Sequence, residues 1–257
     1  MSQRHYARIA DRYDALVTTE ADIGFFLNAA HHAQGPILEL MAGTGRVTLP
    51  LVASGAEVVA VDYSPEMLTH LQSKLAQARL HADVRLMDVR HLALDQTFSL
   101  ILLPFHAFPE ITDPQDQLTA LRAIRAHLAP GGHFICTLHN PPIRRRTVDG
   151  HLRLARRYQE DLHNIFVWLA EQDIGDDTVE VHEFFERYAA DGQLQEKVLS
   201  SVTFHLLTKI AFEEMIHTVG FEVVDLFGDY ARAPFDEQSS PFMVWVLRVL
   251  PHADPQP

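Results

Sequence analysis

The sequence of 257 residues contains a single cysteine, Cys136. One thiol excludes an internal disulfide framework and any multi-cysteine metal site. The 16 histidines show no H-E-x-x-H or other metal-ligand spacing, so we expect no metal ion. Sparse cysteine is typical of a reducing compartment, and we therefore expect a cytoplasmic protein.

Positive charge and long apolar runs are also scarce. Lysine and arginine number 21 against 34 aspartates and glutamates, which gives a formal net charge of −13. Because nucleic-acid binding draws on clustered positive charge, this balance argues against a nucleic-acid partner. No apolar run approaches the roughly 20 residues that a membrane helix needs, and the polar N-terminus has no signal-peptide core, so we expect no membrane partner.

Apolar residues make up 47% of the chain, enough for a sizeable core. In the first half, short apolar runs alternate with segments of helical periodicity, which predicts a mostly parallel sheet with helices on both faces. The predicted strands are 37–40, 57–62, 84–87, 98–103 and 133–138, and the predicted helices include 6–16, one that begins at Pro65, and 114–129.

After Pro141 and Pro142 the apolar period changes to two. Alternating runs separated by Gly- and Asp-containing turns predict an antiparallel β cap, inserted after the fifth strand. A helix over 208–219 and strands at 221–227 and 241–250 bring the main sheet to seven strands. The expected units are N-terminal lid helices (1–35), the core (36–140 and 207–251), the cap (141–206) and a tail (252–257).

Two glycines, Gly43 and Gly45, follow the first predicted strand. Glycines at a strand-to-helix turn let the backbone approach a ligand closely, although a pair alone equally fits a simple tight turn. Asp62 ends the next strand, 19 residues after Gly43, where a carboxylate suits hydrogen bonds to ribose hydroxyls. The third position of the dinucleotide pattern G-x-G-x-x-G is Thr48, which argues against a nicotinamide cofactor.

The run from Glu39 to Gly45, followed by Asp62, Asp88 and Leu128-Ala-Pro-Gly-Gly132, resembles the motifs of class I S-adenosylmethionine-dependent methyltransferases. The resemblance covers about residues 6–138 and 208–250. It implies a Rossmann-like α/β fold, S-adenosyl-L-methionine as cofactor and S-adenosyl-L-homocysteine as product. Many family members carry a further glycine at the position of Met41, and we expect an ordinary backbone conformation at this methionine.

The resemblance also implies roles for individual residues. The glycines face the methionine portion of the cofactor, Glu39 orients the loop and the ammonium, Asp62 binds the ribose, and Asp88 binds the adenine amino group. The complete set of expected cofactor-binding residues is Tyr13, Glu39, Ala42, Gly43, Gly45, Asp62, Tyr63, Met67, Met87, Asp88, Val89 and Leu103.

The opening segment from Tyr6 to Asp14 resembles the lid helix of the small-molecule branch, which includes sugar-amine and glycine N-methyltransferases. There, aromatic side chains close over the cofactor, which favours Tyr13 first and Tyr6 second. The same spacing equally fits a helix that docks through an aromatic stripe.

His106 follows the fourth strand and His139 ends the fifth, where ligands bind in open parallel sheets. An imidazole can accept a proton from an ammonium or a hydroxyl at physiological pH, so both are candidate catalytic bases. Either could instead only line the pocket. The expected substrate-binding residues are Tyr6, Phe105, His106, His139, Arg144 and Tyr158.

Six arginines lie between Arg144 and Arg157 in the predicted cap. They fit a solvated face opposite acidic residues, or a clamp for an anionic group of the substrate, because guanidinium binds carboxylate and phosphate bidentately. By analogy with the family, the cap could also form a homodimer contact.

We therefore expect a methyltransferase that moves a methyl group to a small-molecule substrate by in-line displacement, to nitrogen rather than oxygen. Three alternatives stay open: methylation of RNA or protein, a non-catalytic S-adenosylmethionine-binding protein that associates through the cap, and a nicotinamide-dependent oxidoreductase. The net charge opposes the first and Thr48 opposes the last.

Overall fold

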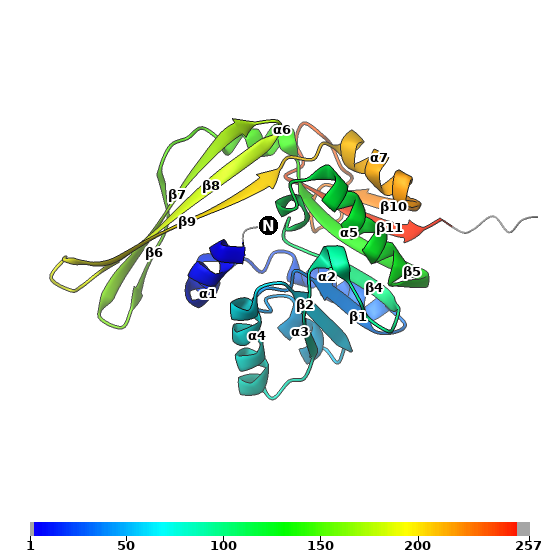
Figure 1. The fold of residues 1–257 in the computed structure, drawn as a ribbon, viewed down its shortest axis with the longest axis horizontal. Helices are drawn as coiled ribbons and strands as arrows, with labels where there is room; N and C mark the ends of the chain where they lie inside the picture. The colour runs from blue at the N-terminus through cyan, green and yellow to red at the C-terminus, as the bar shows by residue number, and fades with distance from the viewer. Residues whose placement is uncertain (1–2, 251–257) are drawn as a thin grey trace, which may run out of the picture.

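The computed structural model describes residues 3–250 and contains two β-sheets (Figure 1). The larger sheet has seven strands in the order β10-β11-β5-β4-β1-β2-β3, and the smaller has four in the order β6-β7-β8-β9. The strands of the larger sheet are β1 (Ile37–Leu40), β2 (Val58–Asp62), β3 (Asp83–Leu86), β4 (Phe98–Leu103), β5 (Leu128–His139), β10 (Phe221–Phe227) and β11 (Phe242–Val249). Those of the smaller are β6 (Arg153–Glu160), β7 (His163–Gly175), β8 (Thr178–Tyr188) and β9 (Leu194–His205).

Strands β1 to β5 pair in parallel, whereas β11 runs antiparallel to both β5 and β10. All pairs of the smaller sheet are antiparallel. The predicted α/β class, with a seven-stranded mostly parallel sheet and a separate antiparallel sheet, is confirmed. Each of the parallel strands ends at the same edge of the main sheet, so the residues that follow them are brought together there.

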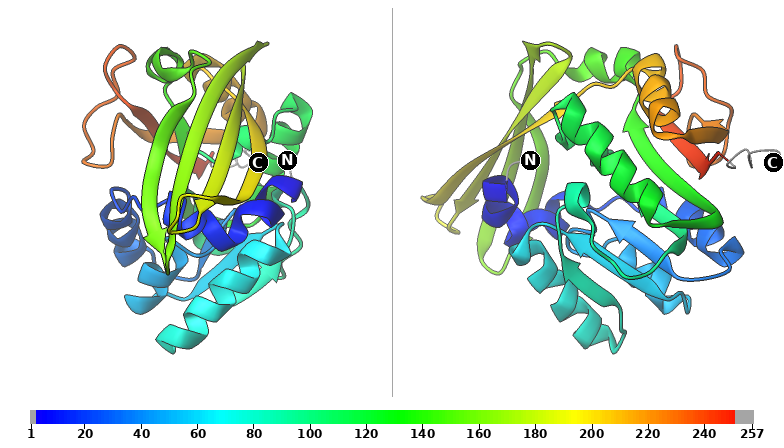
Figure 2. Two further views of the ribbon diagram at one scale, coloured as in Figure 1. Left: turned by 90° about the vertical axis from the view of Figure 1, so that its left-hand side faces the viewer. Right: turned by 45° about the vertical axis from the view of Figure 1, so that its right-hand side comes forward.

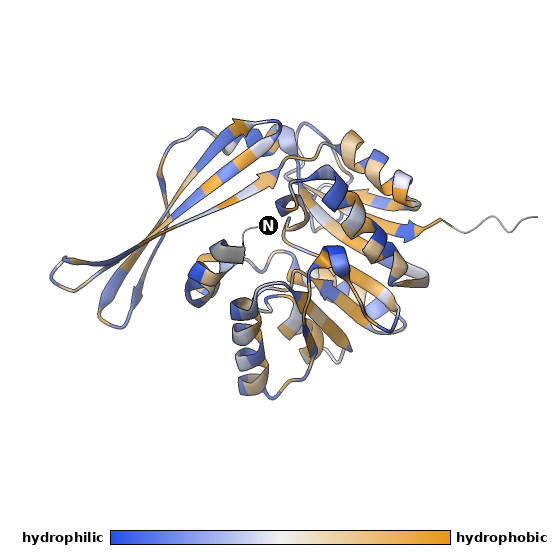
Figure 3. Cartoon of the chain, in the orientation of Figure 1, coloured by the Kyte–Doolittle hydropathy of each residue, from blue (hydrophilic) through white to orange (hydrophobic). Residues whose placement is uncertain are grey.

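Helices cover both faces of the main sheet. They are α1 (Gln3–Leu16), α2 (Ile23–His32), α3 (Thr48–Ala53), α4 (Pro65–Ala78), α5 (Pro114–Ala126), α6 (Pro141–Arg144) and α7 (Lys209–Val219), with 3-10 turns η1 (Val89–His91), η2 (Phe108–Glu110) and η3 (Arg145–Thr147). Helices α5 and α7 pack on one face around Phe134 and Trp245, and α2, α3 and α4 pack on the other. The strands between them are almost uniformly apolar, as burial on both faces requires (Figure 3).

Helix α1 lies between the smaller sheet and α4, and the smaller sheet curves over it (Figures 1 and 2). Ile9 is buried against Ile165, Val167 and Phe185 of the smaller sheet. The helical aromatic stripe seen in the sequence is therefore partly a packing surface. None of the helices in the described part of the chain is both long and apolar enough to span a membrane.

The predicted helix over 114–129 ends at Ala126, and the strand predicted to start at His133 starts at Leu128. The intervening Ala-Pro-Gly-Gly segment bulges out of β5, because Phe98 pairs with Leu128 while Leu100 pairs with His133. A Cβ atom at Gly132 would lie 3.0 Å from the carbonyl oxygens of Phe98 and Ser99. The glycine is thus part of the strand pairing, and a helix stop was the wrong interpretation of this segment.

Candidate active site

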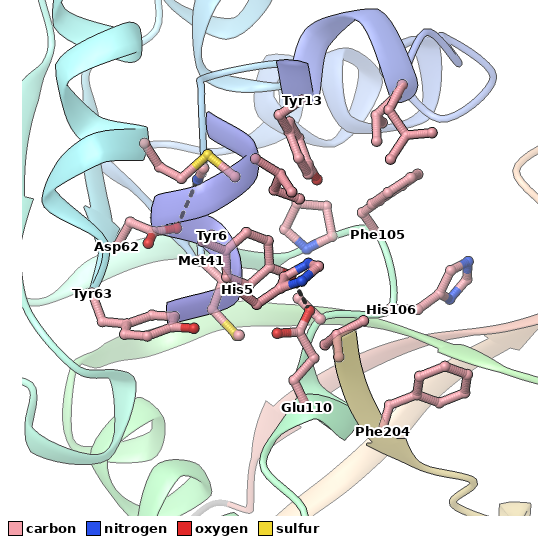
Figure 4. A pocket seen from close by; sticks show the side chains of 18 of the residues that line it. His5, Tyr6, Tyr13, Met41, Asp62, Tyr63, Phe105, His106, Glu110 and Phe204 are labelled. Carbon is pink, nitrogen blue, oxygen red and sulfur yellow. Dashed lines mark hydrogen bonds between the residues drawn. The ribbon is translucent and has the colours of Figure 1, made fainter. Parts of the chain in front are cut away.

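A cavity of about 900 Å³, counting its open mouth, lies at the carboxyl edge of the main sheet. Residues that follow β1, β2, β4 and β5 form one side, and α1 with strands β8 and β9 closes the other (Figure 4). This is the edge where open parallel sheets bind ligands.

Half of the site residues predicted from the sequence line this cavity. These are Tyr6, Tyr13, Gly43, Asp62, Tyr63, Met67, Phe105, His106 and His139. The others lie outside its lining, namely Glu39, Ala42, Gly45, Met87, Asp88, Val89, Leu103, Arg144 and Tyr158.

Asp62 joins the end of β2 to the glycine loop that follows β1. Its Oδ2 accepts a hydrogen bond from the Gly43 amide at 2.8 Å, and its Oδ1 accepts one from the Ser64 amide at 2.9 Å. Burial raises the pKa of Asp62 above its ordinary value, and these amide bonds act in the opposite direction. Because a carboxylate has about four acceptor positions, the side chain keeps capacity for hydroxyl donors in the cavity.

Glu39 lies in the middle of the sheet and accepts a hydrogen bond from Thr48 Oγ1 at 2.6 Å. Burial raises the pKa of its carboxyl to about 8. The hydrogen bond connects β1 to the start of α3, so the observed contact of Glu39 is with the framework of the loop. Gly45 is similarly structural, because a Cβ there would lie 2.3 Å from Leu71 Cδ1.

Asp88 accepts hydrogen bonds from the Arg90 amide and guanidinium. Burial alone would raise the pKa of Asp88, but these bonds outweigh burial and hold it below its ordinary value. Arg90 also pairs with Asp116 on α5. The Asp88 carboxylate is therefore bound to Arg90 and lies outside the described lining of the cavity. Its contact with adenine stays a prediction.

Three tyrosine side chains gather at the mouth of the cavity. The ring centre of Tyr6 lies 6.2 Å from that of Tyr13 and 6.2 Å from that of Tyr63, and the rings meet edge to face in both pairs. Tyr13 comes from the same helix as Tyr6, whereas Tyr63 follows Asp62. Tyr63 Oη is buried with no hydrogen-bond partner among residues 3–250, so it presents an unused polar group to the cavity.

The loop after β4 places Phe105 and His106 in consecutive left-handed conformations, with φ of +57° and +56°. Non-glycine residues adopt this conformation at a cost of about 1–2 kcal/mol each, and such positions concentrate at functional sites. The Arg46 guanidinium lies 4.7 Å from the centre of the Phe105 ring. The His106 amide donates to Thr137 Oγ1 at 3.1 Å, which fixes the loop against β5.

His106 and His139 stack with their ring centres 4.1 Å apart. Burial lowers the pKa of His106 to about 4, with the charges of Asp22 and Arg144 acting less strongly in opposite directions. Burial, together with His106 and Arg144, also lowers the pKa of His139 well below its ordinary value. Both rings are neutral at physiological pH and form an apolar, weakly basic wall.

Three of the six arginines between Arg144 and Arg157 pair with acidic neighbours. Arg144 binds Glu171, Arg145 binds Asp173 and Asp177, and Arg153 binds Asp149. The side chains of Arg145 and Arg153 are exposed, as a solvated face requires, whereas Arg144 and Glu171 are each only 16% exposed. Tyr158 packs with the α1 cluster around Ile9, away from the cavity lining.

Eleven of the residues that line the cavity were not predicted as site residues, and four of these have ionisable or aromatic side chains: His5, Glu110, Glu183 and Phe204. Glu183 had a detectable signal, because it is the one acidic residue on the inward face of β8, between Val181 and Phe185. Glu110 lies in the 3-10 turn η2, which follows the apolar strand β4. In such a turn the spacing of apolar residues does not indicate which way a side chain points.

Met41 contradicts the expectation of an ordinary backbone conformation. Its φ is +55°, the left-handed value that a glycine accommodates freely. The side chain lines the cavity and packs partly against the core beside β1. The loop thus follows the path that a glycine permits, with a methionine in its place.

Residues 37–132 match the family model of a methyltransferase domain. The fold is that of the class I S-adenosylmethionine-dependent methyltransferases, as the sequence motifs predicted. Among curated proteins it is similar to the cypemycin N-terminal methyltransferase of a Streptomyces species, with 37% identity over 98 residues. That match spans 37% of this chain and 38% of the relative, so it covers well under half of either protein.

Solved structures match over nearly the whole chain. The CcbJ methyltransferase from Streptomyces caelestis aligns with a TM-score of 0.81 and 26% identity, covering 97% of this chain and all of that chain. An S-adenosylmethionine-dependent methyltransferase from Clostridium acetobutylicum aligns with a TM-score of 0.79 and 20% identity, over 95% and 99% of the two chains. The similarity includes the smaller sheet as well as the core.

The left-handed backbone at Met41 predicts an unusual order of stability. Met41→Gly should unfold with a free energy about 1 kcal/mol greater than Met41→Ala, because both remove the side chain and only alanine keeps the strain. Denaturant unfolding of the two variants measures the difference. At the exposed helical position Ala76, glycine should instead be the less stable residue. An alanine variant at 41 as stable as the glycine variant would contradict the prediction.

His106 should remain neutral over the physiological range. With its pKa lowered to about 4, the ring signal should not move between pH 8 and 5.5 in an NMR titration, with assignment by His106→Asn. Asparagine suits the left-handed backbone at this position. The same protein unfolded in urea provides the control, since its histidines titrate near the ordinary pKa of about 6.5. A folded-state midpoint near 6.5 would show that the ring is solvated and available as a base.

Proposed function

We propose that this protein transfers a methyl group from S-adenosylmethionine to a small-molecule acceptor, with nitrogen as the acceptor atom. The observation that carries the proposal is the contact between Asp62 and the Gly43 amide at the floor of the cavity. It brings a carboxylate and the backbone of the glycine loop together, as a nucleoside with an amino-acid tail requires.

The residues present fit this cofactor. A Cβ built at Gly43 meets no atom within 4 Å, so the glycine leaves open space beside the Asp62 carboxylate. Tyr63 Oη is buried without a partner among residues 3–250, and Met67 supplies an apolar wall beside it. We assign the ribose to Asp62, the methionine portion to the Gly43 loop, and the adenine side to Tyr63 and Met67.

The bound cofactor supplies a methyl group that is already activated on a positively charged sulfur. The chain contributes position and enclosure. Tyr6 and Tyr13 close the mouth from α1, which excludes water, and the histidine pair bounds the acceptor side. Holding an acceptor and a methyl group in reacting geometry is worth several kcal/mol of the barrier, on the order of 7–11 kcal/mol at most.

The weak basicity of the histidine wall argues against His106 and His139 as bases for a hydroxyl acceptor, which favours a nitrogen acceptor on this side of the cavity. A hydroxyl acceptor must lose its proton as the new bond forms, whereas an uncharged amine attacks without a base. His106, with a pKa of about 4, is poorly suited to remove a hydroxyl proton at neutral pH.

The division of the chain also enters the proposal. We assign residues 36–140 and 207–251 to the cofactor-binding core, and residues 141–206 to a cap that contributes the acceptor side of the cavity through β8. Helix α1 acts as the lid between them.

A thermal-shift comparison of S-adenosylmethionine, S-adenosylhomocysteine, NAD and NADP tests the cofactor. A ligand at 100 times its dissociation constant stabilises by about 2.7 kcal/mol, which raises the Tm by roughly 5–10 °C for a chain of this size. We expect this shift with the two sulfur nucleosides alone. A shift with NAD or NADP, or with none of the four, would overturn the proposal.

Asp62→Asn should weaken S-adenosylhomocysteine binding by about tenfold or more, because it removes the charge that strengthens hydrogen bonds to hydroxyl and amide donors. Isothermal titration calorimetry measures the affinity, and circular dichroism checks the fold. Asp83→Asn provides a matched control, since Asp83 pairs with exposed Arg85 on β3 outside the cavity lining. Equal affinity of wild type and Asp62→Asn would mean that the cofactor lies elsewhere.

A further inference from the structure

Two buried carboxyl groups from distant parts of the chain face the same cavity. Glu110 ends η2, which follows the central strand β4, and Glu183 lies in the middle of β8 in the smaller sheet. Neither is needed for the cofactor contacts assigned above. Figure 4 shows Glu110 between Tyr63 and Phe204, on the far side of the cavity from Asp62.

Glu183 interrupts an apolar row. The inward-facing residues of β8 are otherwise Val179, Val181 and Phe185, all buried. Glu183 is 8% exposed, and its Oε2 has no hydrogen-bond partner in the part of the chain that the structure describes. His5 Nε2 lies 3.8 Å from that oxygen. A carboxyl group at a core position of a strand is costly unless a ligand uses it.

Glu110 is held in place through one oxygen only. Its Oε1 accepts a hydrogen bond from Tyr6 Oη at 2.5 Å. Its Oε2 is buried and has no hydrogen-bond partner within residues 3–250. The bond from α1 therefore orients the carboxyl group and leaves the second oxygen toward the cavity.

No lysine or arginine is among the described residues that line the cavity, so neither side chain compensates these two groups there. The charge of the chain's N-terminal ammonium lowers the pKa of Glu110, but less strongly than burial raises it. Burial lowers the pKa of His5 and of His106 to about 4, so these rings are neutral near pH 7. Burial raises the pKa of Glu110 to about 7, and burial together with the charge of Glu110 raises that of Glu183 to about 7. The environment is thus one that a positively charged ligand would stabilise.

We propose that Glu110 and Glu183 form a subsite that binds the protonated amino group of the methyl acceptor, through the two carboxyl oxygens that lack partners in the cavity. The inference rests on the proposed function and names its substrate class, a small basic amine. An ammonium group offers two or three N–H donors, which matches two acceptor oxygens that converge from η2 and β8.

The subsite also gives the amine a place to leave its proton. An ammonium nitrogen has no lone pair, so it must lose a proton before it can attack a methyl group. The N–H electron pair stays on nitrogen, and the proton moves to a carboxylate oxygen of the pair. This produces a neutral amine and a neutral carboxyl group, with no net change of charge in the cavity.

The predicted pH dependence follows from the groups that face the pair. Glu110 faces Tyr6, Tyr63 and Asp62, and Glu183 faces His5 and Glu110. The tyrosines have raised pKa values and His5 a lowered one, so these side chains keep their charge between pH 6 and 8. The N-terminal amino group, whose charge also acts on Glu110, ordinarily has a pKa of about 7.7–8.0 and gains a proton over the same range, which disfavours a cation in the same direction. As the pH falls through 7 the two carboxyl groups become protonated, and affinity for a cation should fall with them.

Cyclohexylamine and cyclohexanol, which have the same ring and differ in charge, test the subsite by ligand-observed NMR in the presence of saturating S-adenosylhomocysteine. At pH 8 the wild type should bind the amine at least tenfold more tightly than the alcohol, and the preference should shrink at pH 6. Primary alkylamines stay protonated over this range, with a pKa of about 10.4 as in lysine. A smaller preference for the amine at pH 6 therefore reports a change in the charge of the protein and not of the amine.

Glu183→Gln and Glu110→Gln should each reduce the preference for the amine to below about threefold, without changing S-adenosylhomocysteine affinity more than twofold. Glu180→Gln is the matched control, because Glu180 lies on the same strand with its side chain on the opposite face, beside His182. This variant should retain the full preference.

The outcomes separate the two proposals. Normal nucleoside binding with no amine preference in the wild type would overturn the subsite and leave the methyltransferase function in place. A parallel loss of amine and nucleoside affinity in Glu183→Gln would assign the pair to the cofactor and also overturn it. Absence of nucleoside binding in the wild type would overturn the proposed function itself.

Discussion

One buried carboxylate determines the geometry of the cofactor side of this cavity. One oxygen of Asp62 accepts a hydrogen bond from the Gly43 amide, and the other accepts one from the Ser64 amide. Ser64 in turn caps α4 by accepting the Met67 amide. A strand end, a glycine loop and a helix start therefore depend on the same two hydrogen bonds. The two amides favour the charged form of the carboxylate and offset part of the burial that disfavours it.

The acceptor side of the cavity depends on contacts between segments that are distant in the sequence. His5 Nδ1 forms a hydrogen bond of 2.7 Å with Ser200 Oγ, and Tyr6 Oη donates one to Glu110. One turn of α1 therefore connects the smaller sheet to the loop after β4. The register of β8 and β9 places Glu183 opposite Ser200. The smaller sheet and the helix consequently complete a site that neither forms alone.

Much of the architecture could be predicted because periodicity reports burial. Apolar runs located most strands within a few residues, and the motifs assigned Gly43 and Asp62 to one cofactor site; the hydrogen bond between them was not predicted. What failed depends on tertiary context. Nothing local marks Met41 as left-handed, and the bulge at Gly132 appears only once β4 is paired with β5. Asp88 matched a motif, but its ion pair with Arg90 depends on the 3-10 turn η1, which Asp88 caps. Glu183 was overlooked, although the alternation along β8 puts it among apolar residues on one face of the strand.

The paired left-handed residues Phe105 and His106 also affect how such a site can diversify. Most side chains are strained at these two positions, so few substitutions are compatible with the loop, chiefly glycine, asparagine and aspartate. Extended strand backbone in β8 and β9 places no such conformational restriction on its side chains. New acceptor preferences, whether they arise by natural drift or in the laboratory, should therefore accumulate in the smaller sheet, while the loop after β4 stays nearly constant.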